Sequence, residues 1–126
     1  MSLLDDIATY FMSHNLASAG TIFYDGTPDD PDECIAVYEY AGNAFIPQIA
    51  GVLRSVQVVV RSKSQTKARS LANLLYRSLQ TDDGVLYLTE DRWCVMSLRQ
   101  PPFKLKVDTH ARYYFCFNAG ITTYQD

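Results

Sequence analysis

Apolar residues recur at helical spacing in two segments of the chain, residues 2–20 and 65–80. Steps of three and four residues place these side chains on one face, which predicts two amphipathic helices. Ser2 opens a sequence that resembles a capping box, Gly20 is the expected end of the first helix, and Ser64 can cap the second. The repeating apolar positions are Leu3, Leu4, Ile7, Ala8 and Phe11 in the first segment, and Ala68, Leu71, Ala72, Leu74, Leu75 and Leu79 in the second.

Strand patterns, either alternating or rich in β-branched residues, occupy much of the remaining chain. Residues 52–60 have the highest density of valine, so we expect this strand to be central and well buried. The pair Pro101–Pro102 is expected to break the chain, and residues 103–107 alternate like an edge strand with its lysines outward. The other predicted strands are residues 21–24, 34–40, 85–89, 93–100 and 111–119.

The order of these elements is α-β-β-β-α-β-β-β, with the strands clustered rather than alternating with helices. Clustered strands favour an α+β fold: a mostly antiparallel sheet of about five or six strands, with two helices packed on one face. The length of 126 residues suits one core. We therefore expect a single domain over residues 1–126.

Charge is segregated along the chain, although the net charge is only −3. Residues 1–53 contain eight acids and no Lys or Arg, whereas residues 54–77 contain six bases and no acid. The negative total gives no general attraction to nucleic acid or to an anionic membrane. The segregation predicts a subunit with an acidic and a basic side, and such sides favour head-to-tail contact between identical copies.

The sequence offers little catalytic chemistry. The acids of the loop at residues 25–33 do not have the spacing of a calcium-binding loop, and no nucleophile, zinc-protease or phosphate-loop motif is present. We therefore predict no enzyme activity, and no catalytic, cofactor-binding or metal-binding residues. The three cysteines lie far apart in apolar runs, which predicts buried thiols in a reducing cytosol. Cys116 is expected on the opposite face of its strand from Phe115 and Phe117, whose rings are expected in the core.

The basic stretch from Arg61 to Arg69 admits two interpretations. It can form a small nucleic-acid-binding or regulatory module, or it can be a basic corner that contacts an acidic side of another subunit. Lys67 and Arg69 are two positions apart on a predicted helix and so point to different sides. No aromatic residue that could stack on bases lies between Phe45 and Tyr76. The subunit contact is the preferred interpretation, and nucleic-acid binding is the alternative.

Several segments together resemble a family of phage minor capsid proteins. They are "LLDDIATYF" in the first helix, "IAVYEYAGNAF" in a strand and turn, "SVQVVVRSKSQTKARSLANLLYRSL" in a strand and the second helix, and "PPFKLKVDTHARYYFCFN" near the end. Members of this family act as tail terminators or head–tail joining proteins of long-tailed phages. The resemblance spans nearly the whole chain, and the order and combination of the segments carry it.

This resemblance implies a structural protein of the virion. Copies would form a ring, with six copies expected, at the head-proximal end of the tail tube. The ring would end tube polymerisation and dock to the head connector, and a neighbouring neck component would need the same kind of subunit. The implied partners are further copies of the chain, the tail tube protein and the connector or neck proteins, with no membrane and no specific nucleic acid. The protein would be made in the host cytoplasm and reside at the head–tail junction.

The predicted subunit interface combines the charged segments with an apolar loop at residues 41–51, where exposed apolar side chains are unfavourable unless a partner or the core covers them. Its candidate residues are Arg61, Lys63, Lys67 and Arg69 on the basic side, Asp29, Asp30, Asp32 and Glu33 on the acidic side, and Phe45 and Ile46 in the loop.

Overall fold

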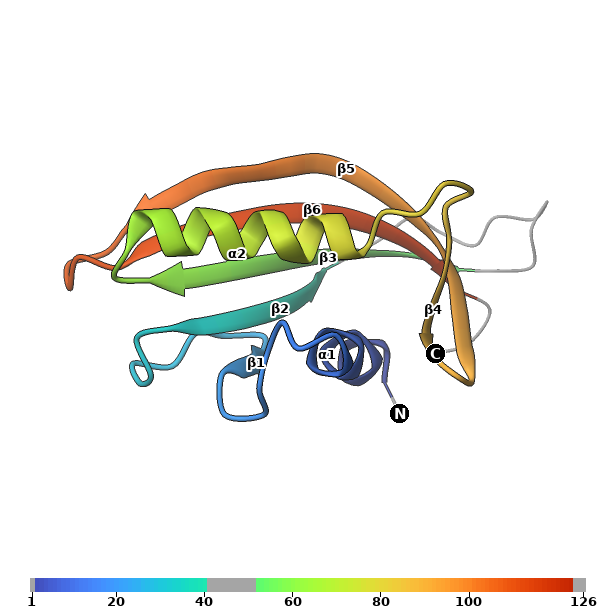
Figure 1. The fold of residues 1–126 in the computed structure, drawn as a ribbon, viewed down its shortest axis with the longest axis horizontal. Coiled ribbons are helices and arrows are strands. Elements are labelled where there is room, and N and C mark those ends of the chain that lie inside the picture. Colours follow the sequence, from blue (N-terminus) through green and yellow to red (C-terminus); the bar gives the residue numbers. More distant parts are fainter. Residues whose placement is uncertain (1, 41–51, 124–126) are drawn as a thin grey trace.

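A six-stranded sheet and two helices make up the computed structural model, which describes residues 2–40 and 52–123 (Figure 1). The strands lie in the order β1-β2-β3-β6-β5-β4. All neighbouring strands are antiparallel except β1 and β2. The predicted α+β class and element order are confirmed. The elements are α1 (Leu3–Ser13), β1 (Ile22–Tyr24), β2 (Cys34–Tyr40), β3 (Val52–Ser62), α2 (Gln65–Ser78), β4 (Val85–Thr89), β5 (Arg92–Val107) and β6 (Tyr113–Thr123).

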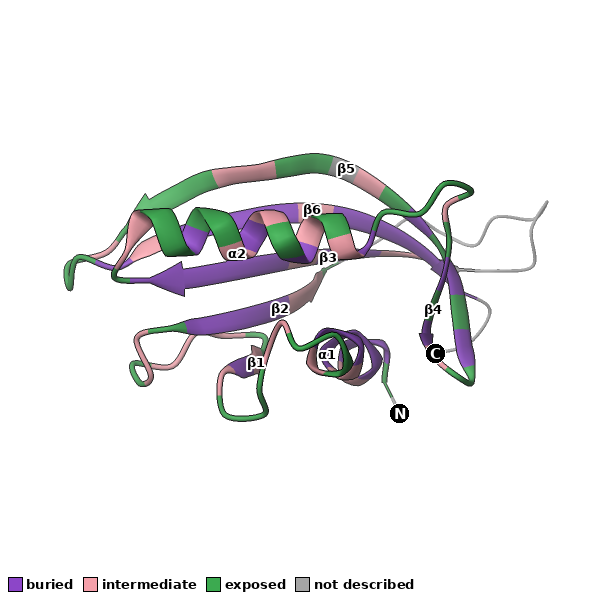
Figure 2. Ribbon diagram, viewed as in Figure 1, coloured by how far each residue is buried: buried purple, intermediate pink, exposed green. Residues whose placement is uncertain are grey.

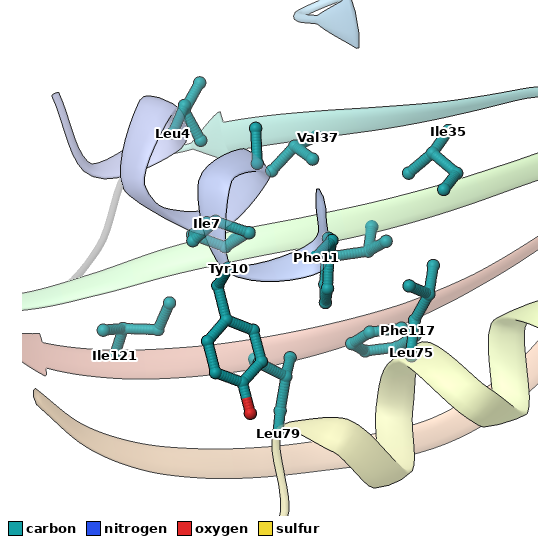
Figure 3. Close-up of a cluster of buried hydrophobic side chains, with 14 of the residues drawn as sticks. Leu4, Ile7, Tyr10, Phe11, Ile35, Val37, Leu75, Leu79, Phe117 and Ile121 are labelled. Atoms are coloured by element: carbon teal, nitrogen blue, oxygen red, sulfur yellow. The ribbon is translucent and has the colours of Figure 1, made fainter. Parts of the chain in front are cut away.

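Both helices pack on one face of the sheet, as predicted, and the main core lies between them and the strands (Figure 3). Alternate residues of β3 and β6 point into this core, because side chains alternate between the two faces of a strand. Val58 of β3 pairs with Phe117 of β6, and both are fully buried. Burial of one such large apolar side chain contributes about 1.5–3 kcal/mol. The tyrosyl hydroxyl of Tyr10 on α1 donates to the carbonyl oxygen of Ser78 at the end of α2, at 2.5 Å.

Side-chain hydrogen bonds cap the N-termini of both helices at the residues that the sequence predicts. Ser2 and Asp5 form a reciprocal capping box at α1, and Ser64 Oγ accepts from the backbone N–H three residues later at α2. The predicted end of the first helix at Gly20 is wrong, since α1 ends at Ser13. Asn15 takes a left-handed conformation with φ of 59° just beyond it. Asparagine adopts this conformation more readily than most residues, and it commonly ends a helix.

Strand β5 runs through the proline pair that we expected to break it. Beyond the residues that pair with β4, the outer edge of β5 has no strand partner within the described chain, so the missing proline N–H groups are not needed on that side. On the inner side, irregular pairing with β6 between Gln100 and Phe103 accommodates the prolines. Residues 103–107 are therefore the end of β5 at the open edge, and their edge position is confirmed.

The second face of the sheet carries a smaller apolar cluster of Ala36, Val59, Tyr114 and Cys116. Cys116 is buried on this face, while Phe115 and Phe117 lie in the main core, as the alternation predicts. The three cysteines are free thiols and are buried. Burial raises the pKa of Cys94 and of Cys116 to about 11, which keeps both thiols protonated and unreactive near neutral pH.

Candidate functional site

Arg61 holds the acidic loop at residues 25–33 against the helix-free face of the sheet. Its side chain, near the end of β3, is only 2% exposed. Its guanidinium donates to the carbonyl oxygens of Pro28 (2.5 Å), Pro31 (2.7 Å) and Asp32 (3.0 Å), and to the Tyr114 hydroxyl at 3.5 Å. The interpretation of Arg61 as part of an exposed basic corner is therefore wrong, because its guanidinium is buried and donates its hydrogen bonds within its own chain.

Arg112, just before β6, is the second buried cation of this region. Its guanidinium donates to Asp108 Oδ2 at 2.8 Å, to the Asp29 carbonyl oxygen at 2.7 Å, and to Asp32 Oδ1 at 3.4 Å. We call Arg61, Arg112, Asp108, Asp32 and Tyr114 the corner cluster. The cluster ties the loop at residues 25–33 to the turn before β6.

Asp108 accepts hydrogen bonds from several donors of its own turn and of β6. They come from the backbone N–H of His110 and Arg112, the Arg112 guanidinium and the Tyr114 hydroxyl. Burial of the Asp108 carboxylate raises its pKa, but the hydrogen bonds from Arg112, Tyr114 and His110 outweigh burial and hold the pKa well below its usual range. The carboxylate is therefore charged at every pH at which the protein is expected to fold.

Two acids of the loop, Asp32 and Glu33, bind groups at and just beyond the end of β3. Lys63 Nζ lies 3.5 Å from Asp32 Oδ2, and the Glu33 carboxylate accepts from the Ser62 hydroxyl at 2.9 Å and from the Lys63 backbone N–H at 3.3 Å. The Asp29 side chain is 98% exposed. Much of the charge that the sequence separates along the chain is thus neutralised within one subunit.

The predicted interface residues on α2, Lys67 and Arg69, are both exposed. Lys67 is exposed in the first turn, and the Arg69 guanidinium lies 5.3 Å from the centre of the Phe115 ring. The nucleic-acid alternative uses Arg61, Lys63, Lys67 and Arg69 together, and of these Arg61 is buried. Phe45 and Ile46 lie outside the described residues.

Sequence reasoning missed a largely apolar pocket of about 430 Å³ between α2, the ends of β2 and β3, and the chain after α1. Leu71 and Leu74 of α2 line it, with Ile35 and Val60 on its floor and Lys67 among its polar residues. Leu74 was expected in the core stripe, yet it is 48% exposed. Helical periodicity gave the face of α2, but it could not show that the sheet ends before covering that face.

A smaller pocket, of about 220 Å³, lies at the corner cluster and is lined by polar and charged residues that include Asp30, Lys63 and His110. Within residues 2–40 and 52–123, no three His, Cys, Asp or Glu side chains are grouped as metal ligands would be. Neither described helix has the length and apolar character that crossing a bilayer requires.

The fold and the cluster define a structural class of protein: a small α+β subunit whose buried charges hold its own loops in place. The chain belongs to the bacteriophage tail terminator family, whose model matches residues 10–125. The resemblance predicted from the sequence is confirmed. A search of curated protein sequences found no match. Membership assigns a structural role in phage tail assembly, with interactions toward tail and head components and a place in the virion.

Proposed function

We propose that this chain is the subunit of a ring that caps the head-proximal end of the tail tube. The ring, expected to contain six copies, ends polymerisation of the tube protein and offers the surface that docks to the head connector. The observation that carries the proposal is the match to the tail terminator family over residues 10–125, which includes all of the described sheet, all of α2 and the end of α1.

The structure is compatible with a passive, rigid assembly part. The corner cluster fastens the loop at residues 25–33, and the described side chains include no buried polar nitrogen or oxygen atom without a hydrogen-bond partner. A subunit whose loops are held in this way loses little conformational freedom on assembly, which favours binding. Large apolar side chains nevertheless remain exposed on β4, β5 and α2, where they can serve as contacts.

The exposed members of the predicted interface remain candidates for contacts in the ring. Lys67 and Arg69 on α2 and Asp30 in the loop at residues 25–33 are accessible. Lys63, Asp32 and Glu33 can take part only while they keep their partners within the subunit. Arg61 acts on such contacts indirectly, by holding the loop.

Tube polymerisation in vitro tests this function. Purified tail tube protein is allowed to polymerise with and without this protein, and tube lengths are measured by negative-stain electron microscopy. We expect added protein to shorten the length distribution and to appear as a ring at one end, and class averages of that end would give the copy number. Unchanged lengths together with bare tube ends would refute the proposal. A ring of another copy number would refute only the sixfold expectation.

A further inference from the structure

The hairpin of β4 and β5 presents an apolar surface on the side away from the main core. Val85 pairs with Val95 and Tyr87 pairs with Trp93, so these four side chains lie together on one face. All four are exposed, Tyr87 most of all at 62%. Burial alternates along this part of the hairpin, since its other face packs in the core (Figure 2). Clusters of exposed large apolar residues mark contact sites more often than single ones do.

Acidic residues surround this apolar face. Asp82 and Asp83 precede β4, Glu90 and Asp91 form the turn between the strands, and all four are exposed. No Lys or Arg occurs in residues 81–91. We call the four apolar and four acidic side chains the hairpin surface. A partner for it needs apolar side chains bordered by positive charge.

The other end of β5 has this character. Leu105 and Val107 are each 44% exposed, and Lys104 and Lys106 beside them are exposed as well. The lysine ammonium groups lie 5.3 Å and 4.7 Å from the centres of tyrosine rings of β6, which limits their movement. No acid occurs in residues 93–107. Lys104 pairs with Phe115 on the helix side of the sheet and Lys106 pairs with Tyr114 on the other side, so the two lysines flank the open edge of β5. We call the residues along this edge, Lys104, Leu105, Lys106 and Val107, the strand-end surface.

We propose that the hairpin surface of one copy of this chain docks on the strand-end surface of another copy. Two hairpin surfaces repel each other through their negative charges, and two strand-end surfaces repel each other through their positive charges. A hairpin surface and a strand-end surface have opposite charges, and both also expose apolar side chains. The two surfaces lie at opposite ends of β5, which runs the length of the sheet in Figure 1. A contact between two different surfaces is heterologous; it continues from copy to copy and closes into a ring where the rotation between copies allows it. The inference rests on the proposed ring and names the contact that builds it.

Within this contact the apolar side chains supply most of the affinity, and the charges set orientation and the rate of association. The rate of association should therefore fall as the salt concentration is raised, but the copies should still associate. The contact also differs from the one predicted from charge segregation, in which Asp32 and Glu33 would bind another copy. Asp32 instead pairs with Arg112 and Lys63 of its own chain, and Glu33 accepts from Ser62.

Charge exchange between copies tests the contact. The variant K104E/K106E makes the strand-end surface acidic, and the variant E90K/D91K makes the hairpin surface basic. Sedimentation velocity of the purified full chain, and decoration of tail tube ends, measure self-association. We expect each variant alone to associate at least tenfold more weakly than the wild type. An equal mixture of the two, and the variant carrying all four changes, should recover most of it.

Two further variants complete the test. Tyr87→Ser removes the most exposed apolar side chain without changing charge and should also weaken association at least tenfold. Arg77→Glu reverses an exposed charge on α2 that lies in neither surface and is not among the predicted interface residues, and it should associate as the wild type does. Circular dichroism and urea unfolding confirm that each variant is folded before it is compared.

The outcomes separate this inference from the proposed function. If rings form on tube ends but the charge exchanges do not change their formation, or only Arg77→Glu weakens it, the ring stands and the docking surfaces are wrong. If association stops at two copies yet follows the exchanges, the docking surfaces stand and the ring is refuted. If no copy associates with another, with or without tubes, both are refuted.

Discussion

Replacing Arg61 with methionine should destabilise the fold severely, because methionine keeps an apolar stem but donates no hydrogen bond. The guanidinium serves three backbone carbonyl oxygens of the loop at residues 25–33 and the Tyr114 hydroxyl. A buried acceptor left without a donor costs about 1–3 kcal/mol. Water can reach part of a loop that loosens, so we expect a loss of about 3–5 kcal/mol for the three carbonyls together.

Such a loss would be a large share of the roughly 5–15 kcal/mol that stabilises a typical domain. Urea unfolding, followed by the fluorescence of Trp93 and by circular dichroism, measures the free energy of unfolding. Limited proteolysis should in addition cut the variant within residues 25–33, at a protease concentration that leaves the wild type intact. Both effects follow from the same lost contacts.

Two further variants serve as comparisons for Arg61→Met. Lys63→Met removes a neighbouring charge that is mostly exposed and paired at 3.5 Å, so it should cost no more than about 1 kcal/mol. Arg61→Lys keeps the charge but replaces a planar fork with a single ammonium group, and its stability should fall between those of Arg61→Met and the wild type. If Arg61→Met lost no more stability than Lys63→Met, the role of Arg61 in holding the loop would be refuted.

Three further predictions follow from contacts already described. The pKa of Asp108 is lower in the folded chain than in the unfolded one, so its stabilisation is present above about pH 4 and is lost as pH falls toward the folded value. The stability difference between wild type and Asp108→Asn should shrink on acidification, and a pH-independent difference would contradict this. Cys94 and Cys116 should react with a thiol reagent at pH 8 only as fast as the fold opens, and rapid labelling of the native protein would disprove their burial. Tyr10→Phe removes the hydrogen bond to Ser78 and should lower the free energy of unfolding by about 1 kcal/mol in urea titrations; no change would show that water replaces it.

The elements that local patterns specify were predictable from the sequence. Periodicity located both helices and the strands, and capping residues placed both helix starts, because these signals depend on neighbours within a few residues. The element order then limited the sheet to an α+β arrangement. The alternation around Cys116 gave the correct face for each side chain of β6.

Features that depend on distant parts of the chain were not predictable. Arg61 belongs to a basic run in the sequence, and only the fold brings it under the carbonyl groups of a loop about 30 residues earlier. The pair Pro101–Pro102 was expected to break the strand because the sequence does not show the irregular pairing with β6 that lets β5 continue through it. The hairpin surface was missed since Val85 and Tyr87 look like ordinary alternating strand residues until their outer face is seen to lack cover.

The position of β6 has a consequence for synthesis of the protein on the ribosome. Among the described strands β6 comes last in the sequence, yet it lies between β3 and β5, so without it the described strands form two separate groups, β1-β2-β3 and β4-β5. Val58 meets Phe117 only after the intervening chain has been translated. Sheet closure is therefore a late event, and a prematurely terminated product lacks the strand that joins its two halves.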